Sequence, residues 1–135
     1  MSYLQHSIDI TDAFIEYWGI NPTQISFMNA PIEGGTEGLD EWIRLSIIEG
    51  NANQASMGSA TNLNRHNGIV LFNIFTVPDG GARRSLELLD SVVDFFKDID
   101  ISNTTFEVPD VSHIGIVDGW FQKNVVCNFY RDETY

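Results

Sequence analysis

The residues best suited to metal binding or nucleophilic chemistry are three histidines and one cysteine, which are His6, His66, His113 and Cys127. Zinc sites place their ligands at short, regular spacings such as HxxxH, HExxH or paired cysteines. None of the three histidines has such a neighbour, so the sequence does not support a zinc site. Cys127 has no cysteine partner for an internal disulfide and lies in a strand-like run. We expect it to be a small buried core residue.

A second chemical possibility is phosphate binding where Gly80 and Gly81 join an apolar run to a helix. A phosphate loop would normally supply Lys or Ser/Thr on the opening turn, and here only Arg83 and Arg84 could substitute. The resemblance to such a loop is superficial. The chain also has no GxSxG motif, and its acidic pairs are typical of solvated loop charges rather than an acid/base dyad. We therefore expect no enzymatic activity, no cofactor and no metal.

Three arginines and a tryptophan have two interpretations each. Arg83 and Arg84 occupy the first turn of a helix, where the dipole disfavours a cation by roughly 0.3–1 kcal/mol. They are either exposed and nearly neutral or face acidic groups of a neighbouring subunit. Arg44 either extends to solvent beside Trp42 or contacts a subunit packed on the sheet. Trp120 is either edge-of-core packing or an interface aromatic.

The element around which the chain is organised spans residues 67–98. Residues 67–77 form a nearly continuous apolar run, which is typical of a strand covered on both faces. A loop with Pro78 and two glycines follows, and then an amphipathic helix from Ala82. Its predicted apolar stripe is Ala82, Leu86, Leu89, Val93 and Phe96.

The other predicted elements are a helix over 8–18, capped by Ser7 or Asp9, and strands over 24–28, 41–49, 103–108, 111–117 and 120–131. Side chains should alternate along 41–49, with Ile43, Leu45 and Ile47 on one face and Trp42, Arg44 and Ser46 on the other. Residues 29–39 are predicted to be a loop, and Asp118-Gly119 a hairpin turn. The sum is one α+β domain over residues 1–135. It has a mostly antiparallel sheet of about five to six strands with two helices packed on one face. Residues 50–66, rich in Asn, Ser and Gly, are predicted to form a long flexible hairpin loop.

Composition restricts the possible partners. The chain has 135 residues, 43% of them apolar, and a formal net charge of −12 from 19 acidic and 7 basic side chains. That charge argues against binding nucleic acid in a groove, which needs a basic surface. No apolar run reaches the ~18 residues of a membrane span. The N-terminus has no basic segment before an apolar one, so we expect no secretory signal and no membrane association.

The order of these features resembles the tail-terminator (tail-completion) proteins of long-tailed bacteriophages over roughly residues 41–131. The features that carry the resemblance are Trp42-x-Arg44 in a strand, a polar stretch ending Arg65-His66-Asn67-Gly68, the strand 69–75 leading to Pro78-x-Gly80-Gly81, the amphipathic helix to Phe96, and a closing Gly119-Trp120-Phe121-x-x-Asn124-Val125 strand.

The resemblance implies a structural virion protein rather than an enzyme. Such proteins form hexameric rings on the head-proximal end of the tail tube, stop tube polymerisation and meet the head-tail connector or stopper protein. The expected partners are further copies of the chain, the tail tube protein and the connector, with DNA passing through the ring without specific binding. The expected location is the tail or neck of the virion, and the host cytoplasm during assembly. The candidate interface residues are Arg44, Arg65, His66, Arg83, Arg84 and Trp120.

Two alternatives remain open at this stage. The same small fold recurs in other neck and tube proteins of such phages. The chain could therefore be one of these proteins, at a different position in the virion. The chain could also be a cytosolic ligand-binding domain or small enzyme that uses a pocket between the helices and the sheet. A pocket lined by Arg65 and His66 would favour this alternative.

Overall fold

The computed structural model describes residues 3–19, 23–27, 40–54, 63–78, 82–101 and 103–134. It confirms the α+β class, with two helices and a six-stranded, mostly antiparallel sheet. In chain order the elements are α1 (Tyr3–Trp18), β1 (Gln24–Phe27), β2 (Glu41–Gln54), β3 (Leu63–Thr76), α2 (Ala82–Asp98), β4 (Thr104–Phe106), β5 (Asp110–Val117) and β6 (Trp120–Thr134).

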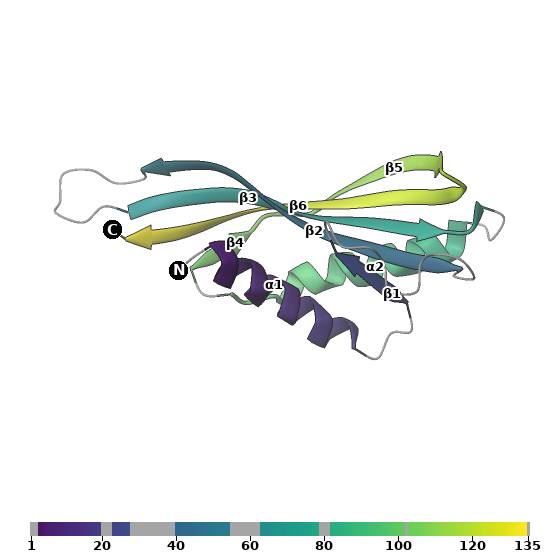
Figure 1. Ribbon diagram of the computed structural model, residues 1–135, viewed down its shortest axis with the longest axis horizontal. Helices are drawn as coiled ribbons and strands as arrows, with labels where there is room; N and C mark the ends of the chain where they lie inside the picture. The colour runs from purple at the N-terminus through teal and green to yellow at the C-terminus, as the bar shows by residue number, and fades with distance from the viewer. Residues whose placement is uncertain are drawn as a thin grey trace.

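The sheet is centred on β3, with strand order β1-β2-β3-β6-β4, and β5 also pairs with β6. Only the β1–β2 pair is parallel. The strands β4 and β5 share one edge of β6, because β4 pairs with residues 129–131 and β5 with residues 120–126. Both helices lie on the same side of the sheet (Figure 1). We call the opposite side the outer face.

Strand alternation sends one set of apolar side chains toward the helices. The register pairs Ile43 with Ile74 and Leu45 with Phe72, and all four side chains are at most 2% exposed. Phe14 of α1 sits at the centre of this layer, with its ring centroid 4.6 Å from that of Phe72. The alternation predicted for residues 41–49 is confirmed, because it follows directly from the period of two along a strand.

The predicted apolar stripe of α2 is displaced around the helix. Leu86 is 47% exposed, although it was expected to be buried, and Val93 is only partly buried. The buried residues are Ser85, Leu88, Leu89, Val92, Phe95 and Phe96. Two overlapping stripes of 3.6-residue period run along this helix, and periodicity alone cannot decide which one faces the sheet.

Both the first helix and the long hairpin are more regular than predicted. The helix α1 begins at Tyr3, five residues before the expected start, so Ser7 lies inside it rather than capping it. In the predicted loop over 50–66, residues 50–54 and 63–66 are strand, with Ala52 paired to His66 and Gln54 to Asn64 beyond a bulge. The loop was predicted because the segment is rich in polar residues. Polar side chains, however, do not prevent the backbone hydrogen bonds that pair two strands. Residues 55–62 and the predicted loop at 29–39 lie outside the described residues.

Between Phe72 and Thr76 the central strand β3 is buried on both faces, as predicted. The two covers differ, because helices lie over one face (Figure 1) whereas no helix lies over the outer face. Phe75 is 7% exposed there because Trp42 stacks on it, with the ring centroids 4.0 Å apart. The Asp118-Gly119 turn is confirmed, with φ of 50° and 81°, as expected for a tight hairpin turn of type I′.

Gly68 is the position in β3 with least room for a side chain. A Cβ there would lie 2.6 Å from Cζ of Phe129 and 2.8 Å from the carbonyl oxygen of Ile48. We expect Gly68→Ala to lower the free energy of unfolding by roughly 1–3 kcal/mol, as overpacking does elsewhere. Urea denaturation would measure it. Phe129→Leu, alone and combined with Gly68→Ala, is the control, since relief of the ring clash should make the double variant lose less than the sum. An alanine variant as stable as the parent would contradict the prediction.

Candidate interface surfaces

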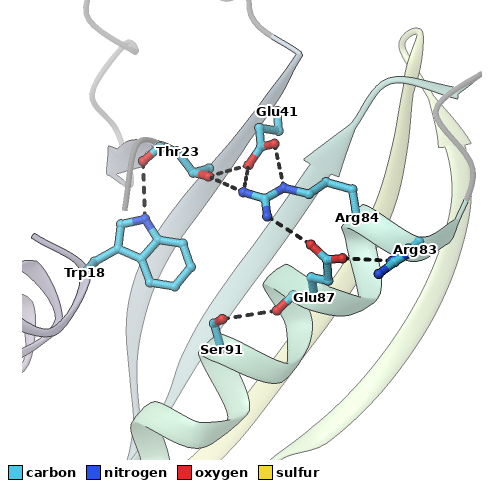
Figure 2. A network of polar contacts seen from close by, with 7 residues as sticks. All are labelled: Trp18, Thr23, Glu41, Arg83, Arg84, Glu87 and Ser91. Carbon is cyan, nitrogen blue, oxygen red and sulfur yellow. Dashed lines mark hydrogen bonds and ion pairs between the residues drawn. The ribbon is translucent and has the colours of Figure 1, made fainter. Parts of the chain in front are cut away.

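A bidentate ion pair joins Arg84 to Glu41 (Figure 2). The guanidinium donates from Nε to Oε1 at 2.7 Å and from Nη2 to Oε2 at 2.8 Å, a bidentate pair. The hydroxyl of Thr23 donates to the same carboxylate. Arg84, and next Thr23, hold the pKa of Glu41 below its ordinary value, although burial acts in the opposite direction.

This network ties four elements together at one end of the molecule. The carbonyl of Thr23, just before β1, accepts a hydrogen bond from Nε1 of Trp18 at 3.2 Å. Glu41 begins β2, and Arg84 belongs to the first turn of α2. Arg84 is therefore engaged within its own chain, which sequence reasoning did not anticipate. Arg83 is 93% exposed on its side chain and pairs with Glu87 at 3.2 Å.

A hollow of about 510 Å³ opens on the outer face, and we call it the aromatic hollow. Its lining residues come from β2, β3, β6 and the β5–β6 turn, and they are Trp42, Arg44, Asn73, Phe75, Val117, Asp118, Trp120 and Gln122. Trp120 stands edge-on to Trp42, with ring centroids 6.1 Å apart. The structure thus brings together two of the candidate interface residues, Arg44 and Trp120.

Within this hollow the guanidinium of Arg44 lies over aromatic rings. Its Cζ is 5.2 Å from the ring centroid of Trp42 and 5.7 Å from that of Phe75, which is cation–π geometry. Trp42 is 6% exposed, and its indole N–H is buried without a hydrogen-bond partner among the described residues. Nearby, the amides of Asn73 and Gln122 both donate to Oδ1 of Asn124.

Arg65 and His66 do not share a site, because neighbouring residues of a strand point to opposite faces. Arg65 lies on the outer face, bonded to Asp132 at 2.9 and 3.2 Å and 4.1 Å above the ring of Tyr130. His66 is buried on the helix side, where its Nδ1 is 3.0 Å from the hydroxyl of Tyr3. The two residues therefore do not line one pocket, which is the arrangement that would have favoured the ligand-binding alternative.

Sequence reasoning missed a buried charged cluster beneath the start of α1. Arg131 is 3% exposed and pairs with Glu133 at 3.1 Å. His6 stacks on Phe129 with ring centroids 5.0 Å apart. Burial, and secondarily Arg131, lowers the pKa of His6. The alternation of side chains between the two faces of β6 could have revealed the cluster, because it places Arg131 on the same face as Val125, Cys127 and Phe129.

Two of the chemical possibilities raised by the sequence are a reactive cysteine and a metal site. Cys127 is fully buried, as predicted, and burial raises the pKa of its thiol to about 12. A thiol that remains protonated is a poor nucleophile. In the ranges that the structure describes, no three His, Cys, Asp or Glu side chains come close enough together to hold a metal ion.

Comparison with known proteins extends the fold assignment but not the function. No protein-family model matches the chain, and no curated protein sequence matches it. A solved structure that carries no functional name is similar over 96% of both chains, with a TM-score of 0.63 at 12% identity. A likeness at this identity shows the fold alone.

The Arg84–Glu41 pair should contribute to stability in a pH-dependent way. We expect Arg84→Gln and Glu41→Gln each to lower the free energy of unfolding by about 1 kcal/mol, since Arg84 is 41% exposed and partly screened by water. Because the folded state lowers the pKa of Glu41, this stability is present above the ordinary value of 4.5 and is lost as pH falls through the folded value.

Thermal or urea unfolding at pH 7 and at pH 3 would test this. The difference between the parent and Glu41→Gln should shrink at the lower pH. The control is Glu16→Gln, which neutralises an exposed carboxylate of α1. A Glu41→Gln variant that loses the same stability at both pH values would show that the ion pair is not the source.

Proposed function

We propose that this chain is a structural virion protein that caps the head-proximal end of a phage tail tube as a ring, with six copies as the expected number. In this role it ends tube polymerisation and forms the junction with the head connector. The proposal starts from the resemblance over residues 41–131. It is supported by the α+β fold, in which helices form one surface and the outer face of the sheet forms the other.

The observation that carries the proposal is the uncovered outer face. Its aromatic hollow is lined by Trp42, Trp120 and Arg44, and aromatic residues and arginine are enriched where one chain binds another. A closed ring needs two different complementary surfaces on every copy. The helix layer and the outer face are two such surfaces. Within them, Arg44, Trp120 and the exposed Arg83 remain the proposed contact residues.

The charge of the chain suits a ring through which DNA passes. With a net charge of −12, most of the surface repels phosphate rather than holding it. Five of the seven basic side chains are paired with carboxylates of the same chain, which leaves few cations for a polyanion. Passage without specific binding is the behaviour expected of such a surface.

The α1 and α2 helices are the only two in the described part of the chain, and neither is long and apolar enough to cross a membrane.

Tube capping can be measured directly. Purified chain added to polymerising tail tube protein of the same phage should give tubes of limited length, with a ring at one end in negative-stain images. The expected stoichiometry is one ring for each tube, because a cap binds only the growing end. Tubes grown without the chain, and tubes grown with an unrelated acidic protein of similar size, are the controls.

The same experiment separates the proposed role from its nearest alternative. A neck or tube-forming protein of the same virion would assemble by itself into stacked rings or long tubes. Tubes that grow without limit in the presence of the chain, with no ring at either end, would refute the capping role.

A further inference from the structure

The helix layer carries an acidic hollow whose carboxylates form no close ion pair with a cation among the described residues, although Lys97 is near enough to Asp98 to interact with it electrostatically. It has a volume of about 300 Å³ and lies between the C-terminal parts of α1 and α2, where Glu16, Tyr17, Asp98 and Asp100 contribute to its lining. All three acidic residues are exposed. The nearby Lys97 is already bound to Asp94 at 2.9 Å. We call Glu16, Asp98 and Asp100 the acidic patch.

The aromatic hollow on the outer face has the opposite character. Arg65, Arg83, Arg84, Lys97 and Arg131 each pair with a carboxylate of the same chain. Arg44 instead forms no ion pair with a carboxylate in the part of the chain that the structure describes, and its guanidinium lies over the rings of Trp42 and Phe75. A cation without a carboxylate partner, placed beside aromatic rings in an open hollow, is suited to a carboxylate from another molecule.

These two surfaces lie on opposite sides of the sheet, because the helices occupy one side and the aromatic hollow the other (Figure 1). One copy can therefore use its acidic patch toward one neighbour and its aromatic hollow toward the other. That is the head-to-tail relation from which closed rings are built. Both surfaces also combine charge with an aromatic residue, Tyr17 in one and Trp120 in the other, as interface centres commonly do.

We propose that the aromatic hollow receives the acidic patch of a second copy of this chain, with Arg44 as the cation that binds a carboxylate of Asp98 or Asp100. This inference deepens the proposed ring and rests on it. Asp118 also lines the hollow and has the same sign as the incoming patch. The negative charge of Asp118 repels that patch and so limits the strength of the contact, because like charges at an interface oppose association.

Charge exchange tests the proposal. The hollow variant is Arg44→Glu, and the patch variant combines Asp98→Lys with Asp100→Lys. Each alone should weaken self-association by roughly 30-fold or more, since each places like charges across the contact. Mixed in equal amounts, the two variants should recover assembly as alternating rings with an even number of copies. One chain carrying all three substitutions should also assemble. Native mass spectrometry reports both the size and the composition of the rings.

Matched controls separate the contact from general charge effects. Lys123→Glu changes the net charge as much as Arg44→Glu does, but Lys123 lies on the other side of β6, beside His113, and should leave assembly unchanged. Asp118→Asn should strengthen assembly several-fold, and Asn tolerates the left-handed φ of 50° at this position. Urea unfolding of every variant checks that a loss of assembly is not a loss of fold. Arg44→Gln provides a second, milder substitution.

The outcomes distinguish this inference from the proposed function. Rings that form equally well with Arg44→Glu, or a mixture that does not recover, would overturn the docking of patch into hollow while capping could still be observed. Rings that follow the charge exchange but fail to limit tube length would support the docking and refute the capping role. A parent chain that remains a monomer both alone and on tail tubes would overturn both.

Discussion

The architecture depends on a mismatch in length between the two layers. At about 3.3 Å per residue, the 14 residues of β3 span about 46 Å, whereas at 1.5 Å per residue the 17 residues of α2 span only about 26 Å. Two short helices therefore cannot cover the sheet along its whole length, and they cover only one side of it. The remaining sheet surface must be shielded by its own side chains or by another molecule.

The structure meets this constraint differently at its two ends. Near the start of β2, the Arg84–Glu41 pair fixes the first turn of α2 against the sheet, and Trp42 and Phe75 shield each other on the outer face. At the far end, the early turns of α1 reach the sheet through Tyr3 and His6, beneath which a charged cluster is buried. Helix packing is thus anchored at both ends by polar contacts, while the aromatic core lies between them.

The sequence predicts the elements of this fold better than their partners. Alternation along 41–49 and the Asp118-Gly119 turn were assigned correctly, because both depend only on neighbouring residues. The face of α2 was misplaced because two apolar stripes overlap. The extension of β2 and β3 into residues 50–66 was missed because backbone pairing does not require apolar side chains. These errors occur where contacts between distant segments decide the structure.

The same contrast between neighbouring residues and distant segments applies to the candidate interface surfaces. The isolation of Arg44 beside Trp42 was visible in the sequence, since both belong to one alternating strand. The bond from Arg84 to Glu41 was not, since 43 residues separate the two. Placing the buried Arg131 required knowledge of which face of β6 meets the helices. The sequence thus identified unusual side chains, but only the fold reveals which of them already have a hydrogen-bond or ion-pair partner within the chain.

The isolated thiol of Cys127 has a consequence for the durability of the chain. It is the only sulfhydryl in the sequence, it is fully enclosed, and its hydrogen points to the carbonyl oxygen of Glu107 at 3.2 Å. The folded molecule therefore holds no disulfide that a reductant could break and no accessible thiol that an oxidant could join to another copy. Its fold does not depend on thiol–disulfide chemistry.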